Sequence, residues 1–350
     1  MSKLKLGVIF GGTSTEHDVS IASGTSVIKN LNKDKYEIHP IYINKQGEWF
    51  KYQCTEQKLK VGDDVKVTEK IDNICEYLKK LDIVFPVLHG LGGEDGSIQG
   101  MLEILRIPYI GSKILGSSLC MDKVYAKIIF DKANILQAKY VYIRKNKNEY
   151  IFVKKDFSEE RYNISEITQK IAGILKFPMF VKPSNSGSSV GINKANNISE
   201  LEEYIKHAEL FDNKILIEEN IIGREIECAV LGNENIETSG LGEIITGDKF
   251  YSFEAKYNNP ESQTIISPDI SEELSKEVKK LAKKAYKATD CKGLARVDFF
   301  VDDIQKKIYI NEINTLPGFT NISMYPKLWE KSGLSYSELL DKLIQLEVNS

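Results

Sequence analysis

The chain has 350 residues, of which 42% are hydrophobic and 28% charged, and its formal net charge is -3 at pH 7. A chain of this length is expected to form two or three domains with sizeable cores, and its near-neutral charge gives no support for a nucleic-acid or membrane partner. The five cysteines stand singly, without a C-x-x-C pair, which is typical of reduced thiols and predicts a cytoplasmic enzyme with most of these thiols buried.

The first third of the chain alternates expected strands and helices. Strands are expected at residues 4–10, 36–44 and 81–88, with a short strand at 108–110, and helices follow the first strand and occupy residues 97–105. The first run is almost continuously apolar, as in a strand covered on both faces, and Ser14 or Thr15 can cap the helix after it. The alternation predicts a doubly wound parallel sheet, and we assign residues 1–121 to this N-terminal α/β domain.

Two further units fill the rest of the sequence. A linking helix at 122–133 opens the second unit, residues 122–213, with strands expected at 140–144, 150–153 and 179–182, a helix at 164–175, and an exposed excursion at 145–163. The third unit, residues 214–350, has expected strands at 215–219 and 225–231 and helices at 271–289 and 336–346. The polar stretch at 246–263 has few apolar anchors and predicts a lid that orders over a ligand. The C-terminal half is therefore expected to be α+β.

Two β-patterned runs near the C-terminus carry oxygen ligands for a hard metal ion. Asp298 lies in one run, Glu312 and Asn314 lie in the next, and residues 302–305 can turn the chain so that the runs pair as antiparallel neighbours. Glu312 and Asn314 are two residues apart and so share one face of a strand. Such oxygens suit Mg²⁺, which substrate phosphates and waters complete. The alternative is a hairpin whose acidic residues face water, which the apolar neighbours disfavour.

Two loops rich in small residues are candidates for ligand binding. The loop at 182–191 offers backbone N–H groups with little side-chain bulk, and Lys182 ends the apolar strand before it, so together they can hold phosphates. A flexible surface turn is the alternative, and the loop is not a Walker A sequence. The loop at 11–18 follows the first strand, where open α/β sheets bind ligands, but it lacks a dinucleotide fingerprint. Its Glu16 either accepts from a substrate ammonium group or favours the dipole of the next helix, and the local pattern favours the second.

In combination, these motifs resemble the ATP-grasp superfamily and, within it, the D-alanine–D-alanine ligases, over essentially the whole chain. Seven segments match in the family's order: residues 11–20, 89–100, 121–123, 182–191, 254–257, 295–298 and 311–320. One departure is Asn185-Ser186, where many relatives carry a charged residue, and we expect it to alter loop dynamics more than chemistry. The resemblance implies an ATP-grasp fold behind the N-terminal doubly wound domain.

The resemblance also implies a reaction, with ATP and D-alanine as substrates and Mg²⁺ as the cofactor. ATP would phosphorylate the carboxylate of a first D-alanine, and the amine of a second would attack this D-alanyl phosphate, giving D-alanyl-D-alanine for peptidoglycan synthesis. Two Mg²⁺ ions, replaceable by Mn²⁺, would bind Asp298, Glu312 and Asn314. The implied ATP contacts are Lys123 and Lys182 on the α- and β-phosphates, Lys256 on the γ-phosphate, Ser189 in the small loop, Glu218, Glu219 and Ile221 around adenine, and Glu225 on the ribose.

For the amino acids, the resemblance implies a second set of contacts. Glu16 would bind the first ammonium group in a network with Ser188 and Tyr257, and His89 would lie near the same substrate. Arg296 and the backbone N–H of Gly318 would stabilise the oxyanion of the tetrahedral intermediate. Ser323 would bind the second carboxylate, and Met324 would shape that subsite. The remaining histidines, His17, His39 and His207, match no functional position and are expected to be structural or solvated.

Two alternatives differ in substrate or class. The same scaffold serves D-alanine–D-serine and D-alanine–D-lactate ligases of the vancomycin-resistance type, but Lys256-Tyr257 and Met324 favour the dipeptide ligase. A non-catalytic ATP-binding regulatory protein should have lost metal or lysine positions, and none is missing from the sequence. We expect a homodimer.

Overall fold

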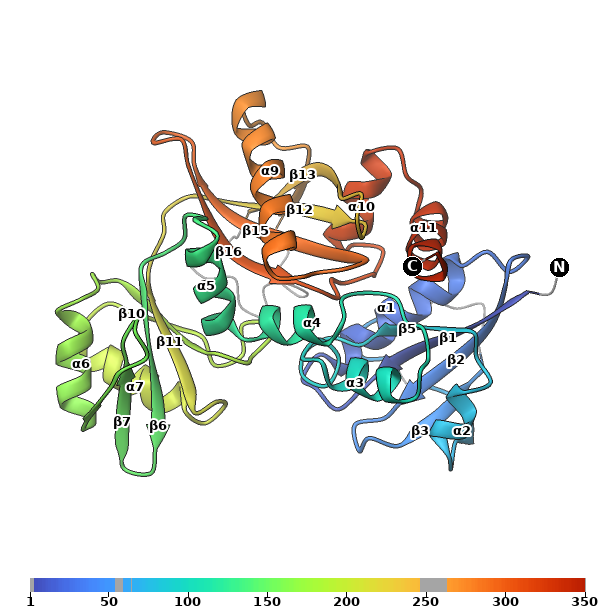
Figure 1. Ribbon diagram of the computed structural model, residues 1–350, viewed down its shortest axis with the longest axis horizontal. Coiled ribbons are helices and arrows are strands. Elements are labelled where there is room, and N and C mark those ends of the chain that lie inside the picture. Colours follow the sequence, from blue (N-terminus) through green and yellow to red (C-terminus); the bar gives the residue numbers. More distant parts are fainter. Residues whose placement is uncertain (1–2, 54–58, 64, 246–262, 350) are drawn as a thin grey trace.

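The computed structural model describes residues 3–53, 59–63, 65–245 and 263–349. Within these ranges the strands form three sheets, and Figure 1 shows them as three lobes that follow one another along the chain, coloured blue, green to yellow, and orange to red. None of the helices in these ranges is long and apolar enough to cross a membrane.

The N-terminal sheet has the strand order β4-β3-β2-β1-β5. Its strands are β1 (Leu4–Gly11), β2 (Tyr36–Ile43), β3 (Trp49–Tyr52), β4 (Val67–Lys70) and β5 (Ile83–Val87). β1 runs parallel to both β2 and β5, so the parallel arrangement is confirmed for these three strands. β3 and β4 instead form an antiparallel extension that was not predicted. The expected strand at 108–110 is reduced to one bridge between Val84 and Tyr109.

Four helices belong to the same region: α1 (His17–Asn30), α2 (Ile74–Leu78), α3 (Ser97–Ile104) and α4 (Ile114–Met121). The predicted capping of α1 by Ser14 or Thr15 is wrong, because the N-cap residue is Glu16 and it makes no side-chain capping bond. Ser14 Oγ instead donates to the carbonyl of His89 at 2.6 Å. This hydrogen bond joins the loops that follow β1 and β5.

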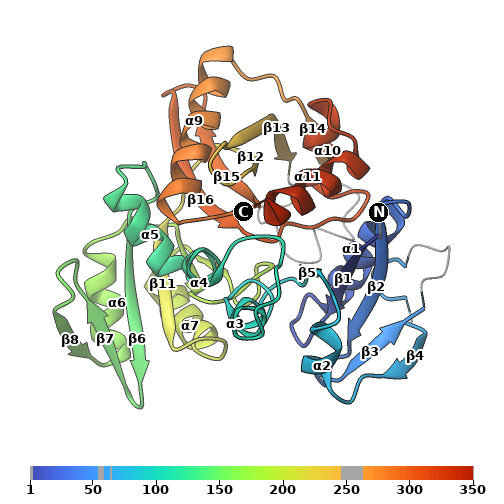
Figure 2. The ribbon, with the colours of Figure 1, turned by 45° about the vertical axis from the view of Figure 1, so that its right-hand side comes forward.

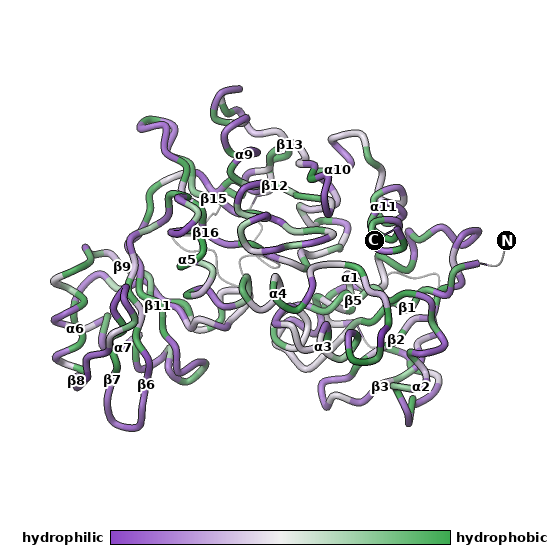
Figure 3. Tube along the Cα trace, viewed as in Figure 1, coloured by the Kyte–Doolittle hydropathy of each residue, from purple (hydrophilic) through white to green (hydrophobic). Residues whose placement is uncertain are grey.

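The central sheet has the order β10-β9-β11-β6-β7-β8. Its strands are β6 (Tyr140–Asn146), β7 (Glu149–Val153), β8 (Glu159–Tyr162), β9 (Met179–Pro183), β10 (Asn193–Ala195) and β11 (Lys214–Glu219), and its helices are α5 (Lys123–Lys132), α6 (Ile164–Ala172) and α7 (Ile198–Ala208). β11 pairs with β6 and β9 and so belongs to this sheet. The expected boundary after residue 213 assigned it instead to the third unit, with the later strands. β8 was not predicted. Figure 3 shows a hydrophilic turn between β6 and β7, although most of β7 is buried.

The C-terminal sheet has the order β14-β13-β12-β15-β16. Its strands are β12 (Arg224–Leu231), β13 (Glu237–Ile245), β14 (Gln263–Ile266), β15 (Leu294–Asp302) and β16 (Lys307–Asn314), and its helices are α9 (Glu272–Ala288), α10 (Met324–Lys331) and α11 (Tyr336–Val348). The predicted antiparallel hairpin is confirmed as β15 and β16. Leu340 of α11 shares a core with Phe10 of β1, and Figure 2 shows α11 beside α1. The last helix therefore ties the third lobe to the first.

Candidate active site

A cavity of about 520 Å³ lies where loops and strands from all three lobes meet. Its volume falls in the range of small-molecule sites. The predicted site residues that line it are Glu16, His89, Lys123, Lys182, Ser188, Ser189, Glu218, Glu219, Ile221, Glu225, Arg296, Glu312, Asn314 and Gly318. Lys256 and Tyr257, and nearly all of the expected lid, lie outside the described residues.

The hairpin of β15 and β16 presents its polar residues on one face. Asp298 lies opposite Glu312 and Arg296 lies opposite Asn314, and side chains at opposed positions of an antiparallel pair point the same way. The Asp298 carboxylate accepts from Arg296 Nε at 2.8 Å and Nη2 at 2.7 Å, and from Asn314 Nδ2 at 2.9 Å. Arg296 Nε also lies 3.3 Å from Glu227 Oε2 on β12. Asp298, the expected metal ligand, and Arg296, the expected oxyanion donor, are thus hydrogen-bonded to each other.

The donor set of this face fits a hard divalent ion. Two carboxylates, Asp298 and Glu312, and the amide of Asn314 converge from adjacent strands, which is the oxygen chemistry that Mg²⁺ takes together with phosphates and waters. In the described part of the chain, no cluster of three or more His, Cys, Asp or Glu side chains could hold a metal by itself. The hairpin therefore suits an ion that a ligand's own oxygens help to bind.

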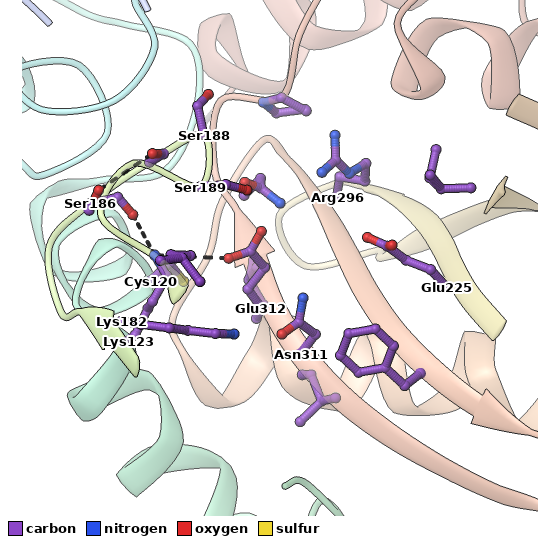
Figure 4. Close-up of a pocket in the computed structure, with 18 of the residues that line it drawn as sticks. Cys120, Lys123, Lys182, Ser186, Ser188, Ser189, Glu225, Arg296, Asn311 and Glu312 are labelled. Atoms are coloured by element: carbon purple, nitrogen blue, oxygen red, sulfur yellow. Dashed lines mark hydrogen bonds and ion pairs between the residues drawn. The ribbon is translucent and has the colours of Figure 1, made fainter. Parts of the chain in front are cut away.

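The glycine-rich loop lies against the first turn of α5. Lys123 N–H donates to the carbonyl of Ser184 at 3.0 Å, and its Nζ donates to the carbonyl of Ser186 at 2.5 Å. Figure 4 shows Lys123 between this loop and Glu312, whose Oε2 is 4.0 Å away. Burial lowers the pKa of Lys123, and the carboxylate of Glu312 offsets only part of this effect. Ser188 and Ser189 adopt left-handed backbone with φ of 47° and 60°, which is uncommon for serine and typical of functional loops.

Two lysines share one buried carboxylate at the β9–β11 side of the cavity. Lys182 Nζ lies 2.5 Å from Glu218 Oε1, and Lys127 Nζ lies 2.7 Å from Glu218 Oε2. Burial alone would raise the pKa of Glu218, but the two ammonium groups hold it at about 2. Burial alone would lower the pKa of Lys182, but Glu218 outweighs it and the pKa is raised. Glu218 and Lys182 are therefore both charged at neutral pH.

Elsewhere in the cavity wall, Glu16 meets the small loop and a second carboxyl group. Ser188 Oγ donates a hydrogen bond to Glu16 Oε1, as the sequence motifs imply. Glu94 accepts from the N–H groups of Gly90 at 2.9 Å and Leu316 at 3.4 Å. Burial, together with the negative charge of Glu16, raises the pKa of Glu94 to about 8. Glu94 is thus protonated at neutral pH, beside the carboxyl group of Glu16.

His89 connects the walls of the cavity through both ring nitrogens. Nδ1 lies 3.0 Å from the carbonyl oxygen of Leu316, and Nε2 lies 2.9 Å from Ser23 Oγ, which also accepts from the N–H of Phe319 at 3.2 Å. Burial lowers the pKa of His89, so the ring is neutral, with Nδ1–H as the donor to Leu316. His89 fixes the turn that carries Gly318, where a Cβ would lie 2.7 Å from Ser323 Oγ.

Three predicted residues do not line the cavity. Asp298 is 2% exposed and reaches the site only through Arg296 and Asn314. Ser323 is the N-cap of α10, and its Oγ accepts from the N–H of Thr320 at 3.0 Å. Met324, expected to shape the second subsite, is 4% exposed, and its Sδ and Cε lie where a Cβ on Gly242 would stand.

Outside the cavity, the remaining histidines are structural, as expected. His17 is buried between Gly12 and Tyr42, His39 pairs with Glu37, and His207 contacts Asn193. Three of the four described cysteines are buried, and all four are free thiols. None of these residues lines the cavity except Cys120.

Sequence reasoning missed two ionisable residues of the site, Lys127 and Glu94. Lys127 follows Lys123 by four residues and so lies on the same face of α5, but a lysine on a charged helix normally faces water. Glu94 lies in a matched segment, and its role was left open. For Lys127 the available signal was its place one helical turn after the matched Lys123. For Glu94 it was its place in the matched segment that begins at His89.

Comparisons with known proteins agree with this geometry. One family model, described as D-ala D-ala ligase N-terminus, matches residues 5–112, and another, described as D-ala D-ala ligase C-terminus, matches residues 129–345. The D-alanine–D-alanine ligase of Acetivibrio thermocellus is 47% identical and covers 99% of this chain and 96% of that protein. The chain belongs to the D-alanine–D-alanine ligase family.

Two solved structures of ligases are similar over almost the whole chain. The VanG D-Ala:D-Ser ligase from Enterococcus faecalis has a TM-score of 0.84 and 35% identity, covering 99% of this chain and 100% of that chain. The D-alanine–D-alanine ligase from Bacillus anthracis complexed with ATP has a TM-score of 0.76 and 31% identity, covering 99% and 98%. The α/β ATP-grasp fold expected for this ligase family is thereby confirmed.

Proposed function

We propose that the chain joins two D-alanines into D-alanyl-D-alanine, through a D-alanyl phosphate, at the expense of ATP. The observation that carries this proposal is one cavity whose wall includes Lys123 and Lys182 together with Glu16, whose carboxylate accepts a hydrogen bond from Ser188. A polyphosphate and an amino acid can thus bind next to each other.

Beside the lysines, the proposed ligand is ATP. Lys123, Lys182 and the small loop with Ser189 would hold the α- and β-phosphates, and Glu219, Ile221 and Glu225 line the part of the cavity proposed for the nucleoside. The likeness to the Bacillus anthracis ligase complexed with ATP supports this placement. Asp298, Glu312 and Asn314 would hold Mg²⁺, which neutralises phosphate charge in phosphoryl transfer. Lys256 is proposed for the γ-phosphate from its motif alone.

Beside Glu16, the proposed ligand is the first D-alanine. The Glu16 carboxyl group, oriented by Ser188, would bind the ammonium group, while the neutral Glu94 and His89 add no charge of their own. The second D-alanine attacks as a free amine, with Arg296 and the Gly318 N–H proposed to stabilise the developing oxyanion. Its carboxylate is assigned to Ser323, and Tyr257 to the network of Glu16. These two roles rest on the motifs.

A second candidate is a D-alanine–D-serine ligase. The likeness to the VanG D-Ala:D-Ser ligase, at a TM-score of 0.84, favours it. The relatives at 47% identity that carry the name D-alanine–D-alanine ligase favour the dipeptide reading.

The test is to identify the products of the purified protein by mass. The protein is incubated with ATP, Mg²⁺ and D-alanine, alone or with equal D-serine or D-lactate, at neutral pH. D-alanyl-D-alanine is expected as the main product in all three mixtures. A D-serine or D-lactate product in equal amount would overturn the substrate assignment, and no phosphate release in any mixture would overturn the ligase assignment.

Assembly and location belong to the same proposal. We propose a homodimer, and we propose a cytoplasmic location, which the free thiols of the described cysteines support. Light scattering of the purified protein tests the dimer, since a monomeric mass at micromolar concentration would contradict it.

A further inference from the structure

A lysine that sequence reasoning passed over shares the carboxylate partner of a proposed ATP ligand. Lys127 lies one helical turn after Lys123 on α5 and is 3% exposed. Its Nζ is 2.7 Å from Glu218 Oε2, while Lys182 Nζ is 2.5 Å from Oε1 of the same carboxylate. Because Glu218 is 4% exposed, two ammonium groups hold one carboxylate that water scarcely reaches.

The surroundings fix Lys127 more firmly than Lys182. Lys127 Nζ lies 3.5 Å from Gln137 Oε1 and 5.4 Å from the centre of the Tyr140 ring, and Gln137 Nε2 donates to the Lys127 carbonyl at 2.8 Å. Lys182 stands near the end of β9, directly before the small loop, with 13% of its side chain exposed. Figure 4 shows Lys182 on the same side of the cavity as Lys123. Both lysines line the cavity, but Lys182 leads into the loop and is the more exposed, so it is the better placed to turn toward a ligand under the loop.

We infer that Lys127 is a positioning residue that stays on Glu218 when Lys182 leaves it for the polyphosphate of ATP. The inference rests on the proposed function, since it concerns how the same site releases a lysine to its nucleotide. Removing the last partner of a buried carboxylate is strongly unfavourable. If Lys182 were the only cation paired with Glu218, leaving it would be costly, and Lys182 would be held away from the phosphates. With Lys127 present, Glu218 keeps a cation and its position beside the proposed nucleoside site.

The charges of the cluster agree with this exchange. Glu218 has a pKa of about 2 despite its burial, and attraction to Lys127 and Lys182 is the reason. Lys182 is also attracted by the carboxylates of Glu312 and Glu225. Glu218 thus pairs with two lysines, and Lys127 remains on it when Lys182 turns to the phosphates.

The test is calorimetric binding of a non-hydrolysable ATP analogue with Mg²⁺. Lys127→Met should raise the Kd at least about tenfold, because breaking the last ion pair of a buried carboxylate opposes binding. Lys127→Arg keeps the charge and should stay within about threefold of wild type. In a Glu218→Gln background, Lys127→Met should change the Kd by less than about twofold, because no carboxylate remains to hold Lys182. Lys132→Met, at the exposed end of α5, is the matched control and should bind like wild type.

The outcomes separate this inference from the proposed function. A wild-type protein that binds no analogue overturns both. A wild type that binds, together with an unchanged Kd for Lys127→Met, overturns the inference alone. An equal loss in the Glu218→Gln background also overturns it, since the effect would then be packing. If Lys127→Met fails to fold by circular dichroism, Lys127→Gln takes its place in the same measurements, and an unchanged Kd for that variant overturns the inference.

Discussion

Glu94 makes the stability of the unliganded protein depend on pH in a direction opposite to that of most carboxylates. Its pKa is raised from 4.5 to about 8 by burial and by Glu16. Between these two values the folded protein holds a proton that the unfolded chain has released, so stability falls as pH rises. The contribution is absent below about pH 4.5 and complete above about pH 8.

The size of the effect follows from the shift. In the unfolded chain Glu94 ionises with its ordinary pKa of 4.5, which is about 2.5 units below pH 7. At 1.36 kcal/mol per unit, this ionisation lowers the stability of the folded protein at pH 7 by about 3 kcal/mol. This figure is an upper bound, because water in the cavity screens the carboxylate. Glu94→Gln removes the ionisation while keeping the shape and one of the two acceptor positions.

The assay is urea denaturation of wild type and Glu94→Gln at pH 5, 6, 7 and 8, without nucleotide and with a metal chelator. As pH rises, the unfolding free energy of wild type should fall relative to that of Glu94→Gln, by about 1 to 3 kcal/mol over this range. Glu234→Gln, whose side chain is 95% exposed, should show no such trend. Parallel pH profiles for wild type and Glu94→Gln would refute the reasoning, since Glu94 would then be ionised throughout.

Three other substitutions test separate parts of the account. Glu312→Gln removes a charge from the proposed Mg²⁺ site with little change of shape, so turnover should fall at least about a hundredfold while the melting temperature stays the same; a near wild-type rate at saturating Mg²⁺ would contradict this. Ser188→Ala removes the donor to Glu16 and should raise KM for D-alanine roughly tenfold without changing nucleotide affinity; an unchanged KM would speak against the Glu16 assignment. Gly24→Ala places a Cβ 2.6 Å from Phe10 Cγ, so it should destabilise the protein by about 1 to 3 kcal/mol in urea, and an unaltered midpoint would show that α1 can shift away from β1.

What could be predicted from the sequence was local and strongly patterned. The apolar run of β1 and the paired runs of β15 and β16 carry their structure in adjacent residues, so their strands and the shared face of Asp298 and Glu312 were expected correctly. β4 has the sequence Val-Thr-Glu-Lys and is exposed along its whole length, so no apolar alternation marks it as a strand. β11 has a clear strand pattern, but its place between β6 and β9 depends on distant partners.

The same limit applies to the site. Motifs located the lysines and carboxylates, but they do not say which side chains pair when no ligand is bound. Arg296 with Asp298, and Lys182 with Glu218, are pairs between groups to which the sequence motifs assign different roles. Met324 follows Ser323 in the sequence and was assigned to the same subsite. In the structure its side chain is buried at the first turn of α10.

The central claim is that a D-alanine carboxylate becomes an acyl phosphate in this cavity, and oxygen transfer measures it most directly. D-alanine labelled with ¹⁸O in its carboxylate is incubated with the protein, ATP and Mg²⁺, and the released phosphate is analysed by mass. The account predicts one ¹⁸O atom per phosphate, in step with the D-alanyl-D-alanine formed. Unlabelled phosphate alongside dipeptide would contradict it, because the carboxylate oxygen would then not have been phosphorylated.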